Sequence, residues 1–160
     1  IAAAWQAALH PHRGAQRVAL LIWGDPSLYD SSLRIAARLD PAPQIQVVPG
    51  ITALQALTAA HAIPVNQIGA PFMVTTGRQL REAGWPPGTD TAVVMLDGHC
   101  AFQGLPGEAY DIWWGAFLGM PQQLLIHGRL AEVAQRIVET RAQARAEHGW
   151  IMDIYLLRRR

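Results

Sequence analysis

Two short bends, each between an apolar run and a polar helix start, carry the residues best suited to binding a ligand. The apolar run 18–23 leads into residues 24–26 (Gly-Asp-Pro), and the shorter run 46–48 (Gln-Val-Val) leads into residues 49–52 (Pro-Gly-Ile-Thr). Glycine lets a ligand approach the main chain, and proline ends a strand. Ligands of open α/β sheets bind beyond the carboxyl ends of strands. The bends therefore predict a small-molecule pocket lined by main-chain amides.

A third apolar run, 91–96, is followed by side chains that can exchange protons. Asp97 and His99 come directly after it, and carboxylates and imidazoles are common general acids and bases. The structural alternative is a core strand that ends in a turn. Trp113 and Trp114 are likewise either core residues or a platform that stacks on a large planar substrate.

Composition excludes several classes of protein. Thirteen basic and twelve acidic residues give a formal net charge of +1 in 160 residues, which argues against nucleic-acid binding through bulk charge. No apolar run reaches the roughly 18 residues of a membrane helix. The histidines are scattered without metal-ligand spacing, and Cys100 is the single cysteine. We expect a cytoplasmic protein with no metal site and no nucleic-acid or membrane partner.

The elements that must position these residues alternate along the first part of the chain. The pattern predicts a helix over 1–9, a strand over 17–23, a helix over 27–39, a strand over 44–48 and a helix over 52–62. Such alternation is typical of parallel βαβ units and an α/β fold. Residues 1–70 form the predicted first unit. It opens without a helix N-cap, from which we expect earlier sequence to be missing.

The pattern changes after a linker at 64–71. It predicts strands over 72–76, 91–96, 112–118, 123–126 and 150–157, a helix over 130–148, and loops over 82–90 and 97–109. Strands outnumber helices, so residues 71–160 should form a second unit with a mixed sheet. In the long helix, the stripe Leu130, Val133, Ala134, Ile137 and Val138 should point inward, with Arg136, Glu139, Arg141 and Arg145 outward.

Three blocks, in this order and spacing, resemble the tetrapyrrole (corrin/porphyrin) methyltransferases: GDPSLYDSS, VVPGITA and TAVVML. The resemblance implies two αβα subdomains of the tetrapyrrole methylase type, with the cofactor in the cleft between them, and usually a homodimer. The Gly-rich cofactor loop near the family's N-terminus has no counterpart here, so the first subdomain should be incomplete.

Two further blocks, WWGAFLG and GWIMD, resemble more narrowly the deacetylating methyltransferase branch of the oxygen-dependent cobalamin pathway. This implies S-adenosylmethionine as methyl donor and a precorrin as substrate, with methylation at C1 of precorrin-5 and loss of acetate. The implied cofactor contacts are Trp23, Gly24, Asp25, Leu28, Thr52, Ala53, Met95, Leu96 and Trp113. Asp97, His99 and Tyr29 are, by position, the candidate acid–base residues for deacetylation.

Three alternatives remain open on the sequence alone. The chain could be another corrin or porphyrin methyltransferase. It could be a non-catalytic, truncated module that binds a tetrapyrrole or dimerises. A Rossmann-type dehydrogenase is a third possibility, although no GxGxxG follows a predicted strand.

Overall fold

The computed structural model describes residues 1–12, 14 and 17–160, and these divide into two compact units. One unit is Ile1–Thr52 and the other is Ala53–Arg160. The division into two subdomains, 1–70 and 71–160, stays a prediction. Among the described residues, no helix is both long and apolar enough to cross a membrane.

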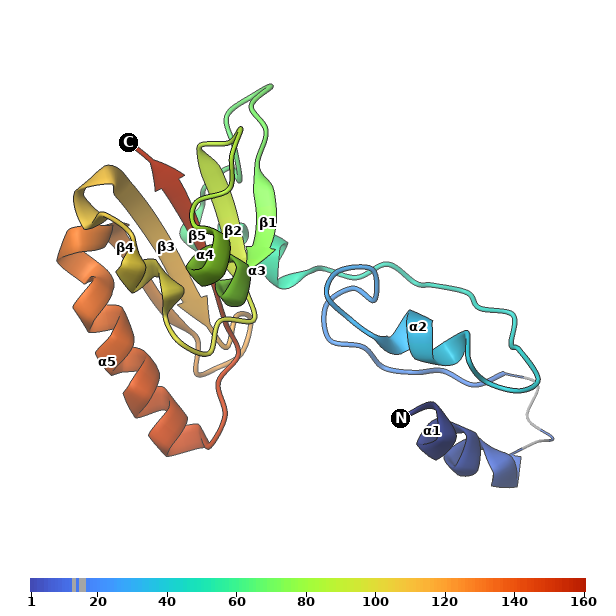
Figure 1. The fold of residues 1–160 in the computed structure, drawn as a ribbon. Helices are drawn as coiled ribbons and strands as arrows, with labels where there is room; N and C mark the ends of the chain where they lie inside the picture. The colour runs from blue at the N-terminus through green and yellow to red at the C-terminus, as the bar shows by residue number, and fades with distance from the viewer. Residues whose placement is uncertain (13, 15–16) are drawn as a thin grey trace. The chain divides into compact units, whose positions relative to one another are not determined.

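The second unit is built on a mixed five-stranded sheet of order β1-β2-β5-β3-β4 (Figure 1). Its strands are β1 (Met73–Thr76), β2 (Thr91–Met95), β3 (Tyr110–Ala116), β4 (Leu124–Arg129) and β5 (Asp153–Arg159). β1 and β2 are parallel, and all other neighbours are antiparallel. The expected α/β class and the expected strands of this unit are confirmed, although β5 begins three residues later than predicted.

A short helix, α4 (Gly77–Ala83), crosses from β1 to the parallel strand β2. The Thr76 hydroxyl accepts a hydrogen bond from the Gln79 amide at 3.2 Å and caps the helix start. Gly84, at φ 75°, follows the last helical residue. The sequence predicts no helix here and a loop from residue 82, because seven residues are too few to show a clear periodicity.

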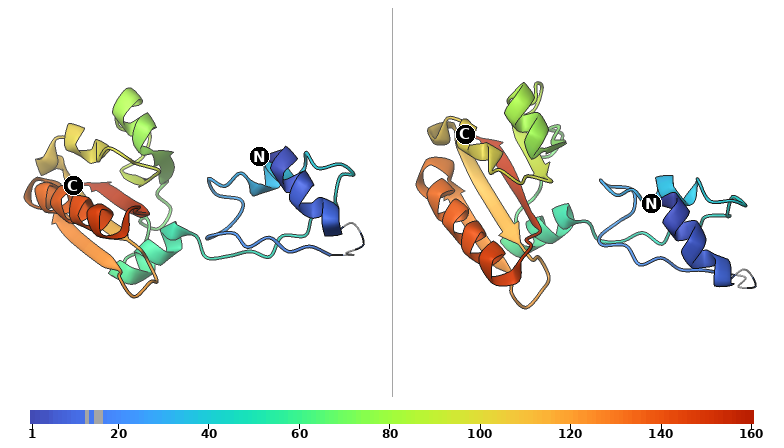
Figure 2. Two further views of the ribbon diagram at one scale, coloured as in Figure 1. Left: turned by 90° about the horizontal axis from the view of Figure 1, so that it is seen from below. Right: turned by 60° about the horizontal axis from the view of Figure 1, so that its bottom comes forward.

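Two helices cover opposite faces of this sheet (Figure 2). α5 (Leu130–His148) packs Leu130, Val133 and Ile137 into the larger core cluster. α3 (Ala53–His61) packs Leu54 and Leu57 into the smaller one. In β5, Tyr155 and Leu157 join the first cluster, whereas Ile154 and Leu156 join the second, since successive strand residues face opposite sides. Both helices lie where the sequence predicted them.

The first unit contains α1 (Ala2–Leu9), the 3₁₀ turn η1 (His10–His12) and α2 (Ser32–Ala36), while the second unit also holds the 3₁₀ turns η2 (Ala101–Gly104) and η3 (Gly107–Ala109). The predicted helix over 1–9 is confirmed. The helix predicted over 27–39 is correct only for its middle, because Tyr29 takes a left-handed conformation (φ 51°) that a helix cannot include.

The strands predicted over 17–23 and 44–48 are wrong for this structure. No strand is assigned in the described part of residues 1–52, and neither segment pairs with a neighbouring strand. A strand needs a partner for its main-chain hydrogen bonds, so apolar composition alone does not make one. Leu21 is 99% exposed and Val48 81% exposed, instead of lying in a sheet core.

Candidate functional site

The two bends of the first unit lie in contact, and Asp25 joins them. One oxygen of its carboxylate, Oδ2, accepts a hydrogen bond from the Gly50 amide at 2.9 Å. The other, Oδ1, accepts from the Ser27 amide at 2.9 Å and also from the Ser27 hydroxyl. The Ser27 hydroxyl, and then the Gly50 and Ser27 amides, hold the pKa of Asp25 below its ordinary value. The ionised Asp25 carboxylate therefore links, by hydrogen bonds, two segments that are 25 residues apart.

The contact between the bends requires glycine. A Cβ on Gly50 would lie 2.1 Å from the Gly24 carbonyl oxygen, and Gly24 itself takes a φ of 75°. The rest of this bend is open: Trp23 and Tyr29 expose much of their surface, and Leu28 is half-buried. The sequence-predicted residues of this unit thus lie on two bends that touch, with exposed side chains at Trp23 and Tyr29.

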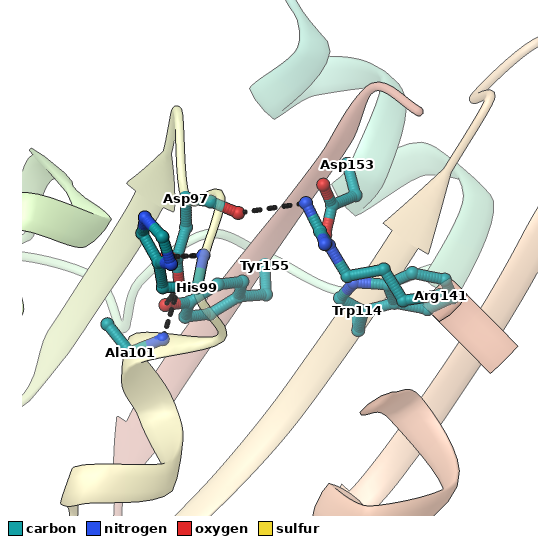
Figure 3. Close-up of polar contacts among 7 residues, drawn as sticks. All are labelled: Asp97, His99, Ala101, Trp114, Arg141, Asp153 and Tyr155. Carbon is teal, nitrogen blue, oxygen red and sulfur yellow. Dashed lines mark hydrogen bonds and ion pairs between the residues drawn. The ribbon is translucent and has the colours of Figure 1, made fainter. Parts of the chain in front are cut away.

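The second group of predicted residues lies at the carboxyl end of β2. Met95 is half-buried, Leu96 is 65% exposed at a φ of 54°, and Asp97 is 7% exposed. The Asp97 carboxylate accepts three hydrogen bonds: from the His99 amide (3.0 Å), from the Ala101 amide (2.6 Å) and from the Tyr155 hydroxyl (2.6 Å) (Figure 3). Asp97 therefore shapes the turn that follows the strand.

A buried ion pair extends this arrangement to α5 and β3. The Arg141 guanidinium donates from Nη2 to the Asp97 carbonyl oxygen at 3.2 Å and from Nε to Asp153 at 2.9 Å. The Trp114 indole N–H donates to the same Asp153 oxygen at 3.0 Å. Burial acts to lower the pKa of Arg141, but the hydrogen bond and charge of Asp153 outweigh it, so the guanidinium stays charged. Figure 3 shows Arg141 between Asp97 and Asp153.

The prediction that Arg141 points outward is wrong. Its side chain is 11% exposed, and it lies on the same helix face as the buried residues Ile137 and Ala144. The sequence also does not predict that Tyr155 and Asp153 belong to this site. Burial first, and then the nearby Asp97 carboxylate, raise the pKa of Tyr155 far above its ordinary value, so its hydroxyl keeps the proton that it donates.

The remaining predicted residues fall in different settings. The His99 side chain is exposed beside Asp97, whereas the half-buried Trp113 packs against the α3 core cluster with the Arg158 guanidinium 5.1 Å from its ring centre. Thr52 directly precedes α3, and Ala53 is the first residue of that helix. Within the described residues, no three His, Cys, Asp or Glu side chains are grouped to hold a metal ion.

Known proteins are similar to this chain in sequence and in fold. A relative from Sinorhizobium sp, named precorrin-6A synthase [deacetylating], is 50% identical over 99% of this chain, which spans 62% of that relative's length. A crystal structure of a Corynebacterium diphtheriae protein described as cobalamin synthesis related (CobF) is 45% identical. It matches with a TM-score of 0.88 over 98% of this chain and 69% of its own.

The uroporphyrin-III-C-methyltransferase of Thermus thermophilus matches at 25% identity with a TM-score of 0.67, over 98% of this chain and 71% of its own. The sequence model that describes the tetrapyrrole (corrin/porphyrin) methylases matches residues 2–134. That range includes both bends and the end of β2, which are the features assembled above. The chain therefore belongs to the tetrapyrrole (corrin/porphyrin) methylase family.

Proposed function

We propose that this chain forms part of an S-adenosylmethionine-dependent C-methyltransferase that methylates C1 of precorrin-5 with loss of acetate, giving precorrin-6A. The observation that carries the proposal is the 50% identity, over 99% of the chain, to a precorrin-6A synthase [deacetylating]. The exposed bends of the first unit and the exposed end of β2 in the second each support a cofactor bound largely through main-chain groups.

We assign the cofactor contacts unit by unit. In the first unit they are the residues of the bends: Trp23, Gly24, Asp25, Leu28 and Thr52. In the second they are Ala53, Met95, Leu96 and Trp113. Gly24 takes a φ of 75°, and a Cβ on Gly50 would meet the Gly24 carbonyl oxygen, so glycine at both positions lets the two bends present their main chain side by side to a nucleoside. When bound, the cofactor supplies a methyl group whose bond to sulfur breaks as its bond to C1 forms.

Loss of acetate needs a water molecule and a base. The water oxygen bonds to the acetyl carbonyl carbon, and the bond between that carbon and C1 breaks. The electron pair of the broken bond stays on C1, where it forms the bond to the methyl group. Of the three predicted acid–base residues, we favour His99 for removing the proton of the water. Its imidazole is exposed, whereas the carboxylate of Asp97 is already occupied by three internal donors. Tyr29 remains a candidate.

Binding to the full chain tests the reaction class. Titration calorimetry should show S-adenosylhomocysteine binding and no NAD(P) binding. Binding of NAD(P) alone would support the dehydrogenase alternative, and binding of a porphyrinoid alone the non-catalytic module.

The acid–base assignment is tested by acetate release from precorrin-5. We expect His99→Gln to slow release by roughly 10²-fold or more, because general-base catalysis contributes that much, while S-adenosylhomocysteine still binds. His148→Gln, which changes an exposed imidazole on α5, is the matched control. Equal rates for the two variants would remove His99 from the mechanism.

We also propose a homodimer in the cytoplasm with a precorrin as its small-molecule partner. Light scattering coupled to size exclusion measures the mass in solution, and the mass of a single chain would contradict the dimer. The expected absence of nucleic-acid and membrane partners stays a prediction.

A further inference from the structure

The turn after β2 has a main-chain shape that needs outside support. Leu96 and Cys100 both take a φ of 54°, a left-handed conformation that is unfavourable for residues with a Cβ. Neither is glycine, so the conformation must be stabilised by the contacts of the turn. The turn also keeps Leu96 exposed at the carboxyl end of the strand.

The support comes from buried side chains both of the turn itself and of β5. Asp97 binds the amides of His99 and Ala101 from within the turn, and Tyr155 on β5 donates its hydroxyl proton to the same carboxylate. Gly77 leaves the space that this carboxylate fills, since a Cβ there would lie 2.3 Å from Asp97 atoms. A carboxylate with three donors holds a fixed orientation.

A second point of support acts on the main chain of the turn. Arg141 donates to the Asp97 carbonyl oxygen, and Asp153 fixes the guanidinium with a hydrogen bond of its own. Trp114 in turn fixes Asp153. The turn after β2 is thereby attached to β5, β3 and α5 at once (Figure 3).

From this geometry we infer that Tyr155 and Arg141 are positioning residues for the cofactor. Acting through Asp97, they hold the turn in the shape that exposes Leu96 beside Met95 at the end of β2. The inference rests on the proposed function, because Leu96 and Met95 are among the assigned cofactor contacts. Neither Tyr155 nor Arg141 touches the cofactor in this scheme.

The test is Tyr155→Phe in the full chain, with two readouts. Hydrogen exchange at the amides of His99 and Ala101 should accelerate roughly tenfold, as expected when a hydrogen bond of the turn is lost. The dissociation constant of S-adenosylhomocysteine should rise by about three- to tenfold for the same reason. In acetate-release assays, KM for S-adenosylmethionine should rise more than kcat falls.

Tyr110→Phe is the matched control. Tyr110 lies in the same core cluster, but its hydroxyl is near Arg159 instead of Asp97. Tyr110→Phe removes the same hydroxyl group, and it should leave hydrogen exchange at His99 and Ala101 and the dissociation constant of S-adenosylhomocysteine unchanged. Should Tyr155→Phe fail to fold, Arg141→Lys, which keeps the charge but loses the planar fork that reaches Asp97 and Asp153, carries the same expectations.

The outcomes separate the two proposals. If the unmodified chain binds no S-adenosylhomocysteine, the proposed function fails and the positioning role for the cofactor fails with it. If it binds and Tyr155→Phe speeds exchange without weakening binding, only the positioning role is overturned. If Tyr155→Phe and Tyr110→Phe behave alike in both readouts, the link through Asp97 is wrong.

Discussion

Gly77 begins α4 beside the buried Asp97 carboxylate, and the missing Cβ is what makes room for it. Asp97 cannot move away without giving up the amides of His99 and Ala101. The glycine is therefore required by a side chain 20 positions further along the chain. Its own backbone is helical and would accept any residue.

Gly77→Ala tests this requirement. We expect it to lower the free energy of unfolding by about 1–3 kcal/mol, the usual cost of an overpacked core, even though alanine favours helix formation. Urea denaturation followed by circular dichroism measures the change. Gly104→Ala is the control, since nothing lies within 4 Å of a Cβ at that position. A Gly77→Ala chain as stable as the control would mean that Asp97 relaxes freely.

At the scale of elements, α3 is joined to β3 by a polar contact at its last residue. The His61 ring donates from Nε2 to the Trp114 carbonyl oxygen at 3.0 Å. Its edge also meets the ring of His127 on β4, with 5.8 Å between ring centres. Burial lowers the pKa of His61, the Trp114 carbonyl opposes this, and His127 adds to the lowering. The folded state thus favours the neutral imidazole.

This lowered pKa gives a pH dependence with a definite sign. The unfolded chain takes up a proton near the ordinary histidine pKa of 6.5, before the folded chain does. His61 should therefore cause stability to fall as the pH drops below about 6.5. We expect His61→Gln, whose amide can still donate to Trp114, to have a shallower decline between pH 7 and pH 5 in urea denaturation. Equal slopes for the two chains would contradict the assignment.

At the scale of the whole molecule, the two units differ in how their main chain is hydrogen-bonded. The central strands β2, β5 and β3 pair on both sides, and their residues fill both core clusters. Residues 17–23 and 44–48 pair with no strand, although the sequence predicts a strand in each. Apolar side chains alone do not bring these segments into a sheet.

Hydrogen exchange should report this difference directly. We expect the amides of β2, β5 and β3 to exchange only on global unfolding, and those of residues 17–23 and 44–48 to exchange within the dead time of a manual experiment. The central strands serve as the internal reference. Protection of residues 17–23 comparable to theirs would show that the strand predicted from the sequence does form in solution.

The sequence by itself determined most of the second unit, because the signals there are local. The stripe of Leu130, Val133 and Ile137 defines α5, and Gly149, at φ 74°, ends it by donating to the Arg145 carbonyl oxygen. The run 91–96 identified β2. The blocks around Gly24, Gly50 and this strand identified the family, since each is a short run of consecutive residues.

Only the tertiary structure decided which polar side chains support the candidate site. Tyr155 lies 58 residues from Asp97, and Arg141 lies 44 residues from it. Their contacts depend on the register of β2 against β5 and on how α5 crosses the sheet, which no local pattern encodes. The same reason explains the segments at 17–23 and 44–48: a strand is a property of a pair of segments, and the partner is supplied by the fold.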